Sequence, residues 1–200
     1  MHITVQQLSS FLVLATVMSI TPGPNNLMVL CSSVRFGAQK TLGHISGASA
    51  GSAIMLLFVG LGLHSVFVTF PQIQETMKYG GAAYILYLSW KIMRDSGEIR
   101  TSDTSRPMTF TGAACFQWIN PKSWVMASVA ISTCLPTDFA LTDIALYTAL
   151  FAVISFPCVG VWAWFGALIK RYLKDASLVR RFNFACAALL VLSAASMALS

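Results

Sequence analysis

Two short polar stretches interrupt long apolar segments of this sequence, and they hold the residues that could bind a small charged molecule. The first, SITPGPNN, covers Ser19–Asn26, and the second, QWINPK, covers Gln117–Lys122. Proline lacks an N–H group and leaves the carbonyl four residues earlier without its helical partner. Such carbonyls can receive an ammonium group, and the unpaired N–H groups that begin the next helix can receive a carboxylate. This chemistry suits an amino acid.

The first break is expected to free the carbonyls of Met18 and Ile20, and the second that of Gln117. Side-chain amides add donors and acceptors, and a lysine adds a charge. The candidate substrate-binding residues are Pro22, Gly23, Pro24, Asn25, Asn26, Gln117, Asn120, Pro121 and Lys122. The structural alternatives are a simple proline kink at each break and a Lys122 side chain that reaches the membrane interface. Because the two polar breaks fall at corresponding places in the two halves of the chain, a binding site is favoured over these alternatives.

Composition indicates which elements must position these residues. Of 200 residues, 56% are hydrophobic and 10% are charged, whereas soluble domains carry about 25% charged residues. The net charge of +6 comes from basic residues that cluster between apolar segments, so it indicates membrane topology and not a nucleic-acid partner. The sequence therefore predicts an all-α integral membrane protein in the lipid bilayer.

Six apolar stretches each approach the roughly 20 residues that a spanning helix needs. They are 7–33, 43–67, 71–93, 109–134, 142–168 and 182–199. Residues 1–93 are expected to form a first three-helix repeat, 94–107 a cytoplasmic connector and 108–200 a second three-helix repeat. Because each half holds an odd number of spans, the two repeats are expected to be inverted.

Lysine and arginine concentrate in alternate connections. The first, third and fifth connections are basic, whereas the second holds Lys78 alone and the fourth holds Asp138 and Asp143 with no basic residue. Basic connections stay in the cytoplasm. Both termini are therefore expected on the periplasmic side of a bacterial inner membrane.

Three motifs resemble the LysE/RhtB family of bacterial amino-acid exporters: TPGPNN in the first span, GAAYILYLSWK (Gly81–Lys91) in the third and NPKSW in the fourth. The resemblance covers essentially the whole chain. It implies a small inner-membrane protein that exports amino acids or close derivatives, driven by the proton motive force. The PNN version looks most like the branch that includes cysteine and O-acetylserine exporters. Pro22, Gly23, Pro24 and Asn25 match the first family motif, and Asn120, Pro121 and Lys122 match the second.

The function expected on these grounds is a secondary transporter that exports cysteine, O-acetylserine, threonine, homoserine or other neutral amino acids. A passive channel for small zwitterions is the alternative, followed by an intramembrane enzyme or a membrane scaffold. The enzyme hypothesis depends on a GxSxG match at Gly47–Gly51, with His44 nearby. A packing face is the favoured interpretation, because Gly43, Gly47 and Gly51 recur every fourth residue. Such a face would also suit a homodimer. Neither a cofactor nor a metal site is expected.

A coupled proton would need a titratable carrier within the spans. All seven acidic residues fall in connections or at span ends. Lys122 and His44 are therefore the candidates for proton coupling. Alternatively, the membrane potential acts on the charge of the substrate alone. Pro157 has no polar neighbours and is expected to kink the fifth span without forming a site.

Overall fold

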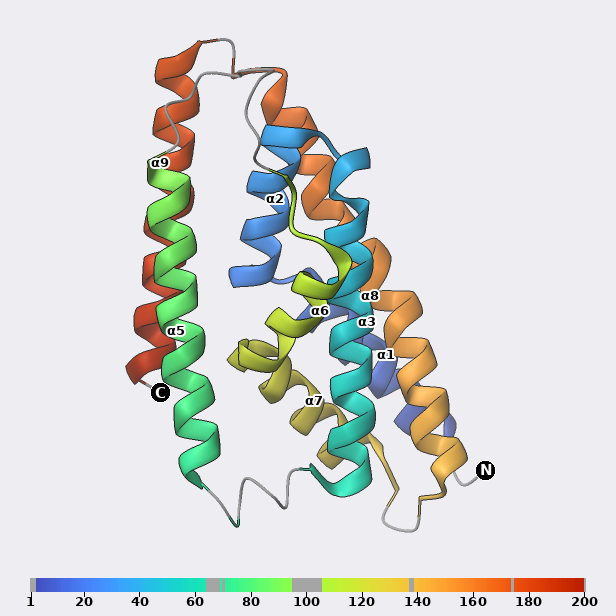
Figure 1. Cartoon of the computed structure of the whole chain (residues 1–200). Helices are drawn as coiled ribbons and strands as arrows, with labels where there is room; N and C mark the ends of the chain where they lie inside the picture. The colour runs from blue at the N-terminus through green and yellow to red at the C-terminus, as the bar shows by residue number, and fades with distance from the viewer. Residues whose placement is uncertain are drawn as a thin grey trace.

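The computed structural model describes residues 3–63, 69, 71–94, 106–136, 139–173 and 175–199. Across these ranges the chain is helical and contains no strand (Figure 1). Most of the predicted connector 94–107 lies outside the described residues, and so does Asp138. The prediction of an all-helical chain is confirmed for the part that the structure describes.

Helices lie where the apolar spans are predicted. The first predicted span holds α1 (Val5–Ile20) and α2 (Pro24–Phe36), and the second holds η1 (Gln39–Thr41), α3 (Leu42–Phe58) and the π-helical turn η2 (Val59–Leu63). The third is α5 (Pro71–Met93), the fourth α6 (Phe110–Ile119) with α7 (Pro121–Cys134), the fifth α8 (Leu141–Lys170) and the sixth α9 (Ala176–Leu199).

Both predicted helix breaks are present. The axis bends by 53° between α1 and α2, and one non-helical residue, Asn120, separates α6 from α7. Pro24 and Pro121 each occupy the first position of the helix that follows the break. There the missing N–H costs nothing, because the first turn of a helix has unpaired N–H groups anyway. Pro157, in contrast, lies inside the continuous helix α8.

Length and composition identify membrane-spanning candidates among the described residues. Three stretches qualify alone, Gln39–Leu63, Leu141–Lys170 and Ala176–Ser196, and the bent pair α1–α2 qualifies as one broken span. The helix α5 and the pair α6–α7 are not among them, although they lie where the third and fourth spans are predicted. Apolar helices able to span a membrane are thus confirmed, while the count of six spans stays a prediction.

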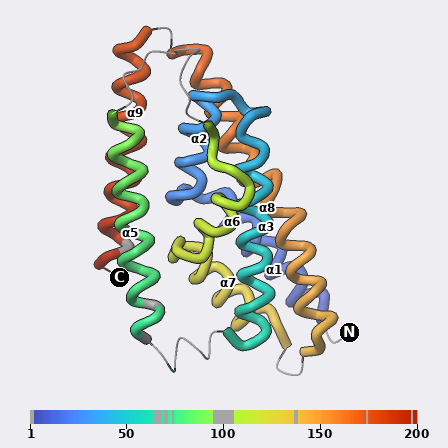
Figure 2. Tube along the Cα trace, viewed as in Figure 1, coloured from blue at the N-terminus to red at the C-terminus, as the bar shows by residue number. Residues whose placement is uncertain are grey.

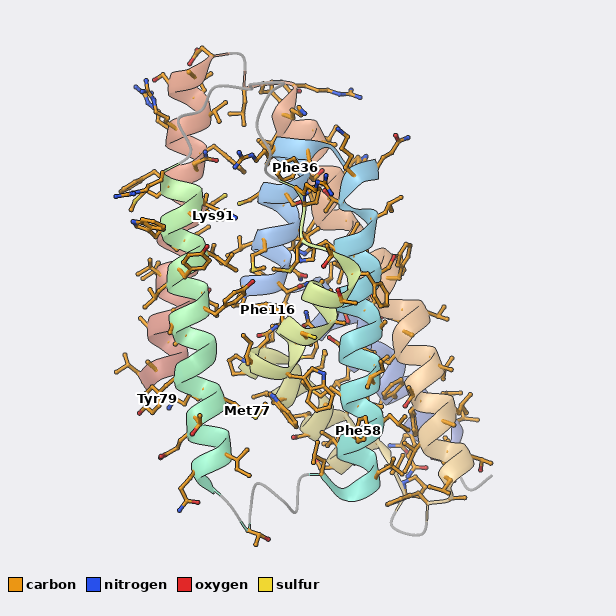
Figure 3. The ribbon with its side chains drawn as sticks, viewed as in Figure 1. Phe36, Phe58, Met77, Tyr79, Lys91 and Phe116 are labelled. Carbon is orange, nitrogen blue, oxygen red and sulfur yellow. The ribbon has the colours of Figure 1, made fainter. Side chains whose placement is uncertain are left out.

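The helices form two groups. In Figures 1 and 2, α5 and α9 stand side by side, apart from a bundle of α1, α2, α3, α6, α7 and α8. Within the bundle, α3 packs against α6 and α8, α1 packs against α8, and α2 packs against α8. The ring of Phe116, labelled in Figure 3, reaches from α6 toward α5, where its centroid lies 5.7 Å from that of Tyr84. The bundle holds both breaks at its centre.

The glycine face on α3 is a packing surface within the chain. A Cβ at Gly51 would lie 2.6 Å from the carbonyl oxygen of Ala114, and a Cβ at Gly47 would overlap the backbone of Phe110. The packing interpretation of Gly47 and Gly51 is therefore right, and their partner is α6. Since α6 covers this face, a homodimer would need another surface.

Candidate functional site

The two helix breaks meet inside the bundle. The Nε2 atom of Gln117 donates to Oδ1 of Asn25 at 3.2 Å. The Nζ atom of Lys122 donates to the carbonyl oxygens of Thr21 at 2.6 Å and of Pro22 at 3.2 Å, and it also lies 3.0 Å from the Thr21 hydroxyl. Residues about a hundred positions apart in the sequence thus form one polar cluster, in which the Lys122 ammonium donates to backbone carbonyls.

The carbonyls expected to be free already have partners. The Met18 carbonyl accepts from the Thr21 hydroxyl at 3.1 Å, and the Ile20 carbonyl accepts from the indole N–H of Trp162 at 3.0 Å. The Gln117 carbonyl accepts from the backbone N–H of Asn120 at 3.2 Å. The expectation that these three oxygens await a ligand is therefore wrong for this conformation. The carbonyls that hold a cation belong to Thr21 and Pro22.

Gln117 is the centre of a buried amide network. Its side chain is 2% exposed, and its Oε1 atom accepts from Ser123 at 2.8 Å, from Ser52 at 3.3 Å and from Nδ2 of Asn120 at 3.3 Å. A buried network with satisfied members stiffens the elements that it joins. Here it joins α2, α3, α6 and α7 around the breaks.

Two of the predicted asparagines hold the ends of helices. Asn26 donates from Nδ2 to the carbonyls of Ser19 at 2.8 Å and Thr21 at 2.9 Å, which secures the end of α1. Asn120 accepts at Oδ1 from the backbone N–H of Lys122 at 3.2 Å, which caps α7. These contacts satisfy backbone groups that a membrane interior cannot. The cap on α7 also covers part of its positive end, whereas the N-cap of α2, Gly23, carries no side chain to do so.

All nine predicted site residues border two adjacent spaces. A polar cavity of about 30 Å³ is lined by Gly23, Asn25, Asn26, Gln117, Asn120 and Lys122, together with other residues. A groove of about 500 Å³ is bordered by Pro22, Gly23, Pro24, Pro121 and Lys122, with residues of α2, α7 and α9. Gly23 and Lys122 border both spaces. A Cβ at Gly23 would lie 2.8 Å from Cδ of Lys122, so glycine allows the lysine to lie across the break.

Comparison with known proteins identifies the family of the chain. The family described as LysE type translocator matches residues 16–200. The chain belongs to the LysE type translocator family.

Cysteine/O-acetylserine efflux proteins are among its relatives. The one from Escherichia coli O1:K1 / APEC is 32% identical over 186 residues, which cover 92% of this chain and 93% of that protein. Those of Escherichia coli strain K12 and Shigella sonnei strain Ss046 are 31% identical with the same coverage. No solved structure matches this translocator at a significant level.

Membership of a translocator family indicates a transporter and not an enzyme. The local geometry at the GxSxG match agrees. The Ser49 hydroxyl lies 3.4 Å from that of Ser155. His44 is 1% exposed, and neither of its ring nitrogens has a hydrogen-bond partner among the described residues. His44 borders neither the cavity nor the groove, whereas Lys122 borders both.

Sequence reasoning missed several residues of the candidate site. Thr21 binds the lysine through two oxygens and is the first residue of the TPGP motif, so the motif itself could have identified it. Ser52 and Ser155 contribute from α3 and α8 to the polar cavity. Serines are common in membrane helices, and only the fold distinguishes these two from the others.

One acidic residue is more deeply buried than its place near a connection suggests. Asp143 lies in the first turn of α8 and is 0% exposed. Its Oδ2 atom accepts from the backbone N–H of Ala140 at 3.0 Å, while Oδ1 has no partner among the described residues. A buried carboxylate is therefore present in this translocator at the end of a span.

Proposed function

We propose that this translocator exports small neutral amino acids or their derivatives, such as cysteine and O-acetylserine, across the bacterial inner membrane. The observation that carries the proposal is the Lys122 ammonium on the carbonyls of Thr21 and Pro22, where the two helix breaks meet. The names of the efflux relatives support the choice of substrate.

In the conformation described above, Lys122 occupies the place that fits the ammonium of a substrate. The substrate's ammonium would replace that of Lys122 on the two carbonyls, and the displaced lysine would pair with the substrate's carboxylate. Charge-assisted hydrogen bonds of this kind contribute about 1.5–3 kcal/mol each. When Lys122 leaves the carbonyls of Thr21 and Pro22, one zwitterion can thus supply a new partner both to these carbonyls and to the lysine. The nine predicted residues would act as the binding site through this exchange.

The lining of both spaces favours neutral substrates. Lys122 is the one charged residue among those that border the cavity or the groove in the described part of the chain. An amino acid with a second cationic group would meet no carboxylate there, and it would be repelled by the lysine. We therefore infer a preference for neutral amino acids over lysine and arginine.

Transport would proceed by alternating access of two inverted three-helix repeats, residues 1–93 and 108–200. Packing supports this relation between the repeats, in which α1, α2 and α3 correspond to α6, α7 and α8. The contact of α3 with α6 then corresponds to that of α8 with α1, and the contact of α2 with α8 corresponds to that of α7 with α3. In Figure 1 the C-terminal ends of α2, α5 and α8 lie at the same end of the molecule, at the top of the view. The described basic residues concentrate in the segments at this end. We propose that this end faces the cytoplasm, so that both termini would lie in the periplasm.

The proton motive force would drive export, with Lys122 or His44 as the group that carries the coupled proton. Lys122 is the first candidate because it lies where the two helix breaks meet, at the proposed place of substrate binding. The second candidate is His44 on α3, which is buried and has no hydrogen-bond partner among the described residues.

Efflux from proteoliposomes tests the proposal. Vesicles loaded with a panel of labelled amino acids are followed with and without a pH gradient that is acid outside. We expect efflux of cysteine, O-acetylserine and other neutral amino acids to exceed that of lysine, and the gradient to drive it uphill. Strictly downhill efflux under both conditions would instead support the passive channel. Absence of efflux for the whole panel would refute export.

A further inference from the structure

Two sides of the last helix, α9, have different surroundings. One packs on α5 through Ala187, Leu190 and Ala194, and there the Ser89 hydroxyl donates to the Ala187 carbonyl at 2.9 Å. The other carries Leu189, Leu192, Ser193 and Ser196 and borders the groove. Their spacing of three, four and seven residues from Leu189 places all four on one side of a helix. The sequence gives α9 no polar break, so none of these residues was expected at a site.

The opposite walls of the groove belong to the site itself. Leu27 and Val125 form apolar walls, while Pro22 and Lys122 form the end at the helix breaks. Val125 is 54% exposed and Leu192 is 65% exposed, so the groove is open between α7 and α9. A molecule held at Lys122 would therefore have α9 as its neighbour.

Volume decides which way a bound side chain can point. The polar cavity holds about 30 Å³, enough for a few waters at about 10–15 Å³ each. The groove holds about 500 Å³, within the range of about 300–1,000 Å³ that is usual for small-molecule sites. With its ammonium and carboxylate at the breaks, an amino acid can place its side chain in the groove but not in the cavity.

We propose that the face formed by Leu189, Leu192, Ser193 and Ser196 is the wall that recognises the substrate's side chain. This inference rests on the proposed export of amino acids. The wall offers two leucines and two hydroxyls. The Ser193 hydroxyl already donates to the Leu189 carbonyl at 2.9 Å, so it remains an acceptor for a weak donor such as a thiol or a hydroxyl. The wall favours short, partly apolar side chains that carry one weakly polar group.

Thiol accessibility distinguishes a substrate groove from a lipid-covered surface. Leu192→Cys and the control Val191→Cys, on a different side of α9, are reconstituted and treated with a hydrophilic maleimide on both sides of the bilayer. Peptide mass spectrometry locates the label among the native cysteines. We expect Leu192→Cys to react faster than Val191→Cys, and O-acetylserine to slow its reaction at least fivefold. Equal, slow labelling would mean that lipid fills the groove, and labelling that O-acetylserine does not slow would also overturn the inference.

A transport assay separates this inference from the proposed function. Ser193→Phe narrows the groove, whereas Val191→Phe adds the same ring elsewhere on α9. We expect Ser193→Phe to lower the ratio of O-acetylserine efflux to alanine efflux about tenfold and Val191→Phe to leave it unchanged. If the wild type exports amino acids but Ser193→Phe leaves the ratio unchanged, the role of α9 alone is refuted. If the wild type exports none, the proposed function is refuted and this inference with it.

Discussion

The ammonium of Lys122 lies 2.6 Å from the carbonyl oxygen of Thr21, so the first turn of α7 is tied to the end of α1 across the centre of the bundle. This contact joins the two predicted repeats at their breaks. It also fills the one cluster of backbone carbonyls that holds a cation in the described part of the site. A substrate that competes with this contact would loosen the junction as it binds and would thereby couple binding to the proposed movement of the two halves.

Removal of the lysine should stop export. Lys122→Ala deletes three hydrogen bonds and the proposed partner of the substrate's carboxylate, and we expect the efflux rate to fall by at least about tenfold. Lys91→Ala, at the end of α5, is the matched control and should keep its activity. Efflux is measured per amount of protein in the membrane, since both variants should insert normally. Wild-type efflux by Lys122→Ala would remove the lysine from the mechanism.

The amide network should matter more than the proline in α8. Asn25→Ala removes one acceptor of the buried Gln117 Nε2, and Asn120→Ala removes one donor to Gln117 Oε1 together with the cap of the Lys122 N–H. A buried polar group that loses its partner costs about 1–3 kcal/mol. Pro157→Ala changes a residue on the outer side of a continuous helix. We expect the two asparagine variants to lose export and Pro157→Ala to keep most of it. The opposite ranking in the efflux assay would mean that the site lies elsewhere.

Close packing of α3 on α6 gives a prediction about stability. Gly51→Ala would place a methyl group 2.6 Å from the Ala114 carbonyl, and such overpacking costs about 1–3 kcal/mol. Gly80→Ala is the control, because in the described part of the chain no atom outside its own stretch of helix lies within 4 Å of the new Cβ. Thermal unfolding in detergent should occur at a lower temperature for Gly51→Ala and should not for Gly80→Ala. Equal unfolding temperatures would contradict the close approach.

Proton coupling can be assigned by comparing downhill and uphill transport. If His44 carries the proton, His44→Gln should keep downhill efflux and lose the acceleration caused by an acid-outside gradient. Asp143→Asn is the informative comparison, because Asp143 is the buried carboxylate that the sequence did not reveal. Loss of coupling in Asp143→Asn but not in His44→Gln would indicate that Asp143 on α8, and not His44, carries the coupled proton.

The sequence predicted the helix breaks well because proline acts locally. Pro24 and Pro121 determine where α2 and α7 begin, whatever surrounds them. The tertiary structure determines which group binds each freed carbonyl. The Ile20 carbonyl accepts from Trp162 and the Thr21 carbonyl from Lys122, and both donors are distant in the sequence. Neighbouring asparagines illustrate the same limit: Asn26 secures α1, whereas Asn25 reaches Gln117 on another helix. No periodicity in the sequence distinguishes them.

The groove wall on α9 was beyond sequence reasoning for a related reason. Leu189 and Leu192 resemble any lipid-facing leucines until α7 is seen opposite them. The glycines of α3 were correctly assigned to packing, but their partner was not identified, because a small-residue face fits any helix that can approach it.

Equilibrium binding of cysteine and cysteamine to purified wild type and Lys122→Ala tests the exchange at Lys122 most directly. Cysteamine has the ammonium and thiol of cysteine but no carboxylate, so for this ligand Lys122 is only a competitor. We predict that Lys122→Ala raises the Kd for cysteine at least about tenfold while the Kd for cysteamine stays the same or falls. Equal changes for the two ligands, or no change for either, would contradict an exchange of Lys122 with the substrate's ammonium.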